Sequence, residues 1–375
     1  MQLKISLAAA TLISAMALQA EDYVSVQYLQ YNENKNRTSI SAPSLIFNKD
    51  FGTDYTLNLN FVADAVSGAS ETWYDGASGA SAFSRGENVN ADDVTYGNVD
   101  YEDTRTAGGA VLTTRFDNRD ELTTGLNYSM ENDFKSTEVS GEYMHWLDSS
   151  KNSSLSFGAS YQFNEVLVHD TVSGGSEAVD ADAINVQLSY FQNLNAESYL
   201  KASIFYIGDS GYLTSPYLNV VRNYDSVANT ADVVQENRPD SRAAYGISLK
   251  YANAITDNLS AHVSYRYYSD DWDIDSHTID SDFYYELHDD WVFKVGLRYY
   301  MQSEASFYNA DKDHFTNEEY ASSDKRLSDF NSLTYKSDVE YFISEEWSVN
   351  LGANYYDQST DLSATYFVGG VTYRF

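Results

Sequence analysis

Strict alternation of apolar and polar residues over about ten positions is the feature that most limits how this chain can fold. In residues 347–356, WSVNLGANYY, one phase carries Trp, Val, Leu, Ala and Tyr, and the other begins Ser, Asn, Gly and Asn. The same period recurs in residues 122–130, 155–163, 259–268 and 291–302. Because successive side chains of a strand point to opposite faces, each segment predicts a strand with one apolar and one polar face.

The apolar phase places aliphatic residues in the middle of each segment and Tyr, Trp or Phe near its ends. Such aromatic girdles are typical of strands in outer-membrane barrels, whose apolar face meets lipid. The chain holds 33 Tyr, 18 Phe and 5 Trp, residues whose rings suit a membrane interface. A soluble β-sandwich also alternates, but its inner face would rarely recur over ten residues in every strand.

The connections between these segments alternate in length. Short turns are expected near residues 50–54, 117–120, 148–153, 193–198, 254–258, 288–290 and 344–346, and long loops near 64–103, 166–182, 208–242 and 304–329. Outer-membrane barrels alternate short periplasmic turns with longer extracellular loops in this way. We therefore predict an all-β fold, a single transmembrane antiparallel β-barrel of about 16 strands, with 14 or 18 as alternatives, and with both termini in the periplasm.

The first twenty residues predict export. Lys4 is their only charge, an apolar run follows from Ile5 to Leu18, and Ala20 precedes the acidic Glu21. This order is typical of a signal peptide, and the run is too short to span a membrane as a helix. We expect a signal peptide over residues 1–20, a barrel over 21–375, and a location in the outer membrane of a Gram-negative bacterium.

Composition excludes several classes of function. The absence of cysteine excludes disulfides, thiolate metal sites and thiol nucleophiles. The formal net charge of −33 argues against nucleic-acid binding, which needs a basic face. An acidic protein suits divalent cations or cationic solutes better.

The last strand predicts how the chain is assembled. Phe375, Tyr373 and Val371 share its apolar phase, and the chain ends on the aromatic residue. Outer-membrane barrels resemble one another in such a terminal aromatic residue, which their assembly machinery reads. We expect these three residues to be an assembly signal and the partners to be outer-membrane lipid and that machinery; a periplasmic or lipoprotein partner is left open.

Several short motifs resemble a known family. They are DAVSGAS at residues 64–70, GYLTSPY at 211–217, RPDSR at 238–242, YRYYSDDWDIDSHTI at 265–279, LRYYMQSEASFY at 297–308 and SSDKRLSDF at 322–330. In their order and spacing they resemble the bacterial family catalogued as domain of unknown function 3570. That resemblance implies an exported or outer-membrane protein and carries no established activity or substrate.

Two groups of polar residues are candidates for a site. The turn SDDWDIDSH could bring together oxygen and imidazole ligands for a divalent cation at the extracellular rim, although a solvated hairpin tip explains the same residues. Its candidate ligands are Asp270, Asp271, Asp273, Asp275 and His277. No other cofactor is expected.

The second group is a set of arginines expected to meet in the outer half of the lumen. Its members are Arg238, Arg242, Arg266, Arg298 and Arg326, with Asp280, Asp282 and Glu286 as their expected ion-pair partners. Opposed charges of this kind can form a selectivity constriction, or they can be a structural ion-pair ladder.

Three functions remain open. A channel or transporter for small solutes, cationic ones in view of the net charge, is expected first. A plugged barrel that acts as a surface binding or assembly protein is the alternative. An enzyme at the rim is the least expected, because no complete set of nucleophile, base and orienting acid is visible among the six histidines and their neighbours.

Overall fold

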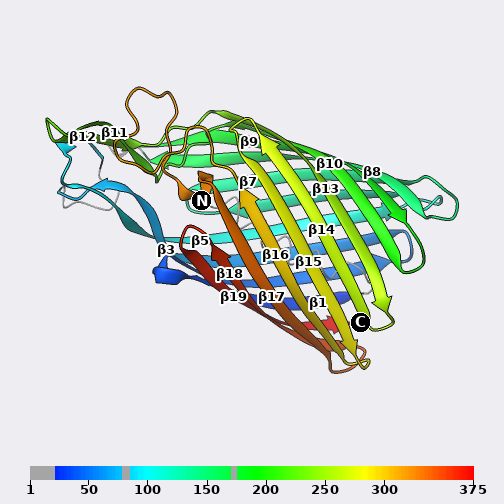
Figure 1. The fold of residues 1–375 in the computed structure, drawn as a ribbon. Coiled ribbons are helices and arrows are strands. Elements are labelled where there is room, and N and C mark those ends of the chain that lie inside the picture. The colour runs from blue at the N-terminus through cyan, green and yellow to red at the C-terminus, as the bar shows by residue number, and fades with distance from the viewer. Residues whose placement is uncertain (1–21, 78–84, 170–174) are drawn as a thin grey trace.

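The computed structural model describes residues 22–77, 85–169 and 175–375, and their architecture is a closed antiparallel barrel (Figure 1). Its sixteen strands are β1 (Tyr23–Glu33), β2 (Thr38–Phe51), β3 (Tyr55–Asp75), β5 (Val94–Arg115), β6 (Glu121–Met130), β7 (Phe134–Trp146), β8 (Ser153–His169), β9 (Ser176–Asn193), β10 (Ser198–Gly211), β13 (Ser241–Thr256), β14 (Leu259–Asp270), β15 (Asp275–Leu287), β16 (Trp291–Gln302), β17 (Phe330–Phe342), β18 (Trp347–Gln358) and β19 (Leu362–Arg374). The predicted all-β barrel of sixteen strands is confirmed.

The barrel closes where the first strand meets the last. Tyr23 of β1 is in register with Arg374 of β19, and Glu33 with Ala364. Every other neighbour in the ring is the next barrel strand along the chain. A closed ring leaves no unpaired strand edge, which is the condition for a sheet to stand in lipid.

The two faces of the strands follow the predicted phase. On β18, Leu351 is 66% exposed on the outside of the barrel, whereas Ser348 on the inner face is 1% exposed. On β16, the residues with outward phase are all exposed: Trp291, Phe293, Val295, Leu297, Tyr299 and Met301. The outer surface is therefore the apolar one, and polar side chains line the lumen.

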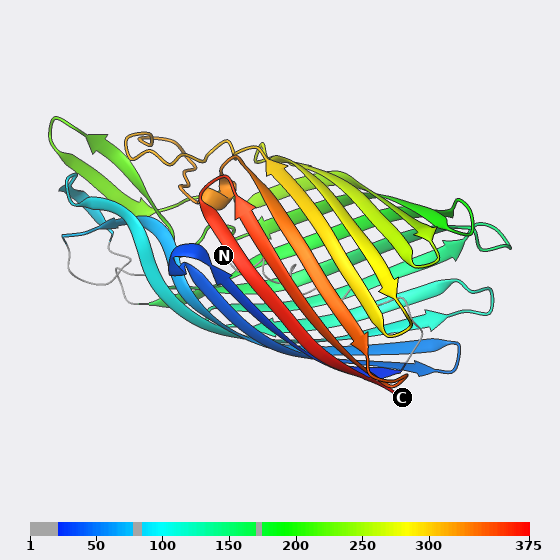
Figure 2. The same cartoon turned by 60° about the horizontal axis from the view of Figure 1, so that its bottom comes forward.

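The seven expected short turns all connect neighbouring barrel strands, and they lie at the same end as the C-terminus (Figure 2). We call this the turn end and the opposite one the loop end. At the loop end two expected loops are shorter than predicted, because β3 and β5 stay paired as far as Asp75 and Val94, and β8 and β9 as far as His169 and Ser176. In these strand ends, Gly, Ser and Asp interrupt the alternation of apolar and polar residues. The sequence pattern therefore predicts loops in these segments.

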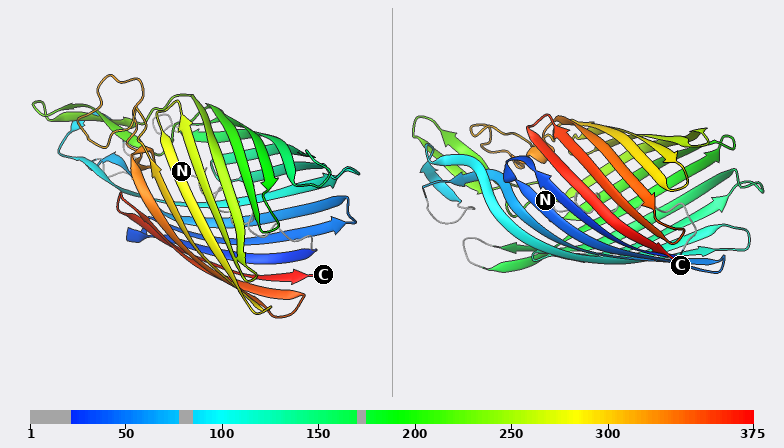
Figure 3. Two further views of the ribbon diagram at one scale, coloured as in Figure 1. Left: turned by 45° about the vertical axis from the view of Figure 1, so that its right-hand side comes forward. Right: turned by 90° about the horizontal axis from the view of Figure 1, so that it is seen from below.

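An ordered cap lies beyond the loop end (Figure 3). We define the cap as a three-stranded sheet of β4 (Gly86–Asn90), β11 (Asn219–Asp225) and β12 (Thr230–Gln235), with residues 212–218, 236–240 and 303–329, the last including the 3₁₀ helix η2 (Lys325–Leu327). A second 3₁₀ turn, η1 (Asn34–Asn36), joins β1 to β2. In the described residues, no helix is long and apolar enough to span a membrane.

The buried apolar clusters belong to the cap and to the strand ends beside it. Val221, Ala231 and Val233 pack with Trp73 and Val94, at the far ends of β3 and β5. A second cluster joins Trp272 and Ile274, in the turn after β14, to cap residues Ala305, Phe307 and Leu327. The cap is thus a small folded unit with its own core, which explains why loops of this length are ordered.

The cap reaches across the barrel mouth. The backbone N–H of Asn219, after β10, donates to Thr72 Oγ1 of β3 at 2.7 Å, although β9, β8, β7, β6 and β5 lie between β10 and β3 in the ring. Lys325, before β17, contacts Glu71 of the same strand at 2.7 Å, although β18, β19, β1 and β2 lie between them. Loops from two sides of the ring therefore meet on β3.

The two faces predict opposite responses to the same substitution. Leu351→Arg should lower the free energy of unfolding by about 2–4 kcal/mol, because it places a charge in lipid near mid-strand. Asn350→Arg should cost less than about 1 kcal/mol, since Asn350 faces the lumen beside Glu340 and the substitution removes only its side-chain hydrogen bonds to Gln27. Urea titration of the refolded barrel in lipid vesicles measures both free energies, and equal destabilisation would contradict the assigned faces.

Candidate functional site

Two arginines stand in the lumen without an acidic partner. Arg266 of β14 and Arg298 of β16 both have the inward phase, opposite to the exposed Val263 and Leu297. In the described part of the chain, neither guanidinium has a carboxylate oxygen within the 4.0 Å of an ion pair. Arg266 instead lies over the ring of Phe205 from β10, with its guanidinium carbon 4.4 Å from the ring centroid. A weakly hydrated, planar guanidinium favours such stacking.

Tyrosines with inward phase surround these arginines. Tyr268 and Tyr300 each lie two residues further along the same faces of β14 and β16. Arg298 is in register with Thr334 of β17, which is in register with Tyr356 of β18, and Tyr366 of β19 has the inward phase, opposite to the exposed Phe367. Tyr366 is in turn 6.3 Å, between ring centroids, from Tyr31 of β1. We call Arg266, Arg298 and these five tyrosines the arginine–tyrosine belt.

The carboxylates expected to pair with these arginines are taken by lysines, so the expected pairing is wrong. Lys336 of β17 contacts Asp280 at 2.8 Å and Asp282 at 2.6 Å, and Lys294 lies between Asp282 and Asp338 at 4.0 and 3.7 Å. Lys294 also lies beside the ring of Tyr284. Long lysine side chains from β16 and β17 contact the aspartates of β15 across the lumen face. The alternation of residues predicts which face a side chain is on, but not which neighbour it contacts.

Glu286 was expected in the same charged cluster, and that expectation is also wrong. It lies next to the last residue of β15, at the turn end, in register with Val292. Arg298, by contrast, lies four residues before Gln302, the last residue of β16 at the loop end. The two charges therefore belong to different depths of the lumen.

The lumen holds two further cations that were not among the predicted site residues. Lys201 of β10 and Lys250 of β13 are directly opposite each other in register, and both have the inward phase. No ion pair of either lysine appears in the described residues. The alternation of residues 199–207, YLKASIFYI, carries the signal, since Lys201 shares the phase of Tyr199, Ser203 and Phe205.

The other three arginines belong to the cap or its border and are neutralised there. Arg238 contacts Glu236 at 2.6 Å and Asp324 at 2.8 Å, and Arg326 pairs with the same Asp324. Arg242 pairs with Asp270, and its guanidinium carbon is 4.6 Å from the ring centroid of Trp272. The five candidate arginines thus form two sets, three in ion pairs at the loop end and two free of them in the lumen.

Asp324 is the centre of the cap's ion-pair network. Burial alone would raise the pKa of its carboxyl, but the charges of Arg326 and Arg238 outweigh that effect and hold the pKa below its ordinary value. The carboxylate also accepts the backbone N–H of Arg326 at 3.0 Å and so caps η2. One buried acid therefore joins the 303–329 connection to the 236–240 segment.

The divalent-cation site expected in the turn after β14 does not form, so that expectation is wrong. Asp270 turns inward, binds Arg242, and accepts the backbone N–H groups of Trp272 and Ile274, both at 3.0 Å. Asp275 and His277 have the outward phase and bond to Tyr267 and Tyr265. Asp271 accepts the backbone N–H of Ala243, and Asp273 occupies the tight turn with φ of 67°. The five side chains diverge because Asp270 turns inward, Asp275 and His277 face outward from β15, and Asp271 and Asp273 lie in the turn between the two strands.

The terminal residues lie where the last strand meets the first two. Phe375 is exposed on the outer face, 6.0 Å from Tyr373 and 6.4 Å from Phe47 between ring centroids. Its backbone N–H donates to the carbonyl of Asp22 at 3.0 Å. Val371 is exposed on the same face. Their role as an assembly signal stays a prediction.

Several solved structures resemble the barrel. CdiB from Acinetobacter baumannii matches with a TM-score of 0.54 at 8% identity over 95% of this chain, which spans 60% of CdiB. The CymD monoaromatic hydrocarbon channel matches at 0.46 and 11% over 96% of this chain and 89% of its own. A bacterial polysaccharide outer membrane secretin matches at 0.48 and 9%, over 95% and 98%. At these identities the likeness concerns the fold alone.

No curated protein sequence matches the chain. One family does, under the description Protein of unknown function (DUF3570), and the match runs from residue 3 to residue 372 of the 375. The motifs at residues 64–70, 211–217, 238–242, 265–279, 297–308 and 322–330 all fall inside that match, and so do the arginine–tyrosine belt and the cap. The chain therefore belongs to this family.

Proposed function

We propose that this protein is a capped outer-membrane channel for small organic anions. The observation that carries the proposal is the arginine–tyrosine belt, whose two guanidinium groups face the lumen with no carboxylate within ion-pair distance in the described residues. Asp280 lies in register with Arg298, but a guanidinium without an ion pair in the described residues is available to a passing anion. The tyrosine rings and hydroxyl groups beside it can contact the uncharged part of the solute.

Organic anions are the opposite of the cationic solutes that the net charge of −33 predicts. Charge on outer loops acts through water and salt, and it is screened within about 8–10 Å. Inside the barrel, Asp280, Asp282 and Asp338 are already shared between Lys294 and Lys336. Lys201 and Lys250 add positive charge along the same wall. The local charge of that wall therefore favours anions.

A plugged barrel that binds a ligand or partner at the surface is the second candidate. It is favoured by the cap, whose loops cross the mouth and have a core of their own. The two proposals differ in whether solutes pass when the cap loosens. Conductance measurements distinguish the channel from the plugged barrel, whereas binding measurements do not.

Removal of the two lumen arginines should shift selectivity toward cations. A unit charge about 8 Å from an ion in water contributes about 0.5 kcal/mol, with opposite sign for chloride and for potassium, so Arg266→Ala with Arg298→Ala should change the chloride-to-potassium permeability ratio by up to about thirtyfold. Reversal potentials in planar bilayers under a KCl gradient measure that ratio. Lys135→Ala is the matched control, because Lys135 lies on the outer face and pairs with Glu165 at 2.8 Å. An unchanged ratio in the double variant would count against anion selection by the belt.

Loosening the cap should open the channel. Asp324→Ala leaves Arg238 and Arg326 without their shared carboxylate, and breaking such a buried pair costs roughly 3–5 kcal/mol. We expect faster tryptic cleavage within residues 303–329 and a higher open probability than in Asp313→Ala, an exposed acid of the same loop. If wild type and Asp324→Ala are both silent at every voltage while cleavage is faster, the channel proposal fails and surface binding is favoured.

A further inference from the structure

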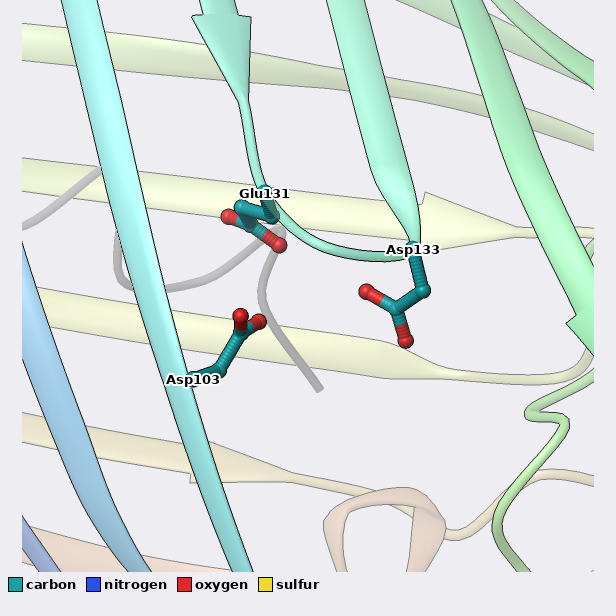
Figure 4. Close-up of side chains that lie close together, drawn as sticks. All are labelled: Asp103, Glu131 and Asp133. Carbon is teal, nitrogen blue, oxygen red and sulfur yellow. The ribbon is translucent and has the colours of Figure 1, made fainter.

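Three carboxylates meet at the loop end, away from the belt (Figure 4). Asp103 lies on β5 just beyond the point where β6 ends, and Glu131 and Asp133 flank the middle residue of the three-residue turn from β6 to β7. One ligand oxygen of each lies within 4.8 Å of the others. Figure 4 shows the three side chains directed toward a common space from two separate segments of the chain.

Glu131 distinguishes this group from an ordinary acidic surface patch. The residue is only 9% exposed, and its Oε2 is buried without a hydrogen-bond partner in the described residues. A buried carboxylate oxygen that no donor satisfies costs free energy. Burial, followed by the charge of Asp103, raises the pKa of Glu131 to about 7, although Arg105 acts in the opposite sense.

We propose that Asp103, Glu131 and Asp133 bind a hard divalent cation, Ca²⁺ in preference to Mg²⁺. Oxygen ligands suit both ions, but Ca²⁺ takes them at about 2.3–2.6 Å in an irregular sphere, so opposite ligands lie about 4.6–5.2 Å apart. The three oxygens lie within 4.8 Å of one another, a spread that such a sphere accommodates. Mg²⁺ requires shorter distances in a near-ideal octahedron, which ligands from a turn and a separate strand meet less readily.

The site would also connect the barrel to the cap. Asp133 accepts the hydroxyl of Tyr217, which belongs to the cap segment before β11. Asp103 Oδ1 accepts the side-chain amide of Asn132 at 2.8 Å, so the turn is already folded around the space. A bound cation would neutralise the three acids while these contacts persist, and it would tie β5, the β6–β7 turn and the cap together.

Calorimetric titration of CaCl₂ into the refolded, lipopolysaccharide-free protein tests the site, after equilibration with EDTA and its removal. We expect one saturable site with a Kd on the order of 10⁻⁴–10⁻³ M, in the range of extracellular calcium modules. Glu131→Gln keeps the shape of the side chain and removes its charge, so it should weaken binding at least about tenfold. Glu102→Gln is the matched control, because Glu102 is the exposed neighbour of Asp103 on the opposite face of β5.

Asp103→Asn gives a second test if Glu131→Gln fails to migrate as a folded barrel on unheated gels. Loss of binding in either charge-neutral variant, with binding retained in Glu102→Gln, supports the site. No saturable heat in the wild type, equal binding in all variants, or tighter binding of Mg²⁺ than of Ca²⁺ would overturn it. A wild type whose thermal stability ignores Ca²⁺, while Glu131→Gln is more stable in EDTA, would also overturn it, because Glu131 would then simply carry a proton.

Discussion

Closure of the backbone hydrogen-bond ring is the constraint on which the rest of this structure depends. In lipid an unpaired N–H or C=O costs several kcal/mol, so every strand must have two neighbours and the first must meet the last. The pairing of β1 with β19 satisfies that condition from Tyr23 to Glu33. Ring closure uses the backbone hydrogen-bonding groups of the spanning strands. Function must therefore reside in the inward side chains and in the connections between strands.

Charged side chains are arranged differently in the cap and in the lumen. At the cap and its border, Arg238 and Arg326 lie beside Asp324 and Arg242 lies beside Asp270, because an unpaired buried charge would be costly. The lumen is wet and tolerates cations without such partners, and there Arg266, Arg298 and Lys250 can act on solutes. An acidic protein can thus carry a cationic passage, since selectivity depends on the side chains nearest to the ion.

The sequence predicted those parts of the structure that repeat with period two. Strand number, the short turns and the lipid face at Leu351 follow from that period, because each strand must satisfy the same environment. Contacts made by long side chains or by distant loops do not follow from it. Lys336 contacts Asp280 from two strands away. Asp324 pairs with Arg238, which is 86 residues away in the sequence, and with Arg326, which is two residues away. The acids of the turn after β14 are separated because Asp270 turns inward onto Arg242 and the backbone N–H groups of Trp272 and Ile274, contacts that period two does not predict.

Thiol reactivity in intact outer membranes tests most directly whether the inner face is a wet passage that attracts anions. The chain has no cysteine, so single substitutions report without background. Ser248→Cys lies in register with Arg266 on the lumen side of β13, and Ile247→Cys lies on the lipid side. We predict that S248C reacts with water-soluble methanethiosulfonates, faster with the anionic reagent than with the cationic one, and that I247C reacts only with a lipid-soluble maleimide. Equal labelling of both positions, or faster reaction of S248C with the cationic reagent, would contradict that prediction.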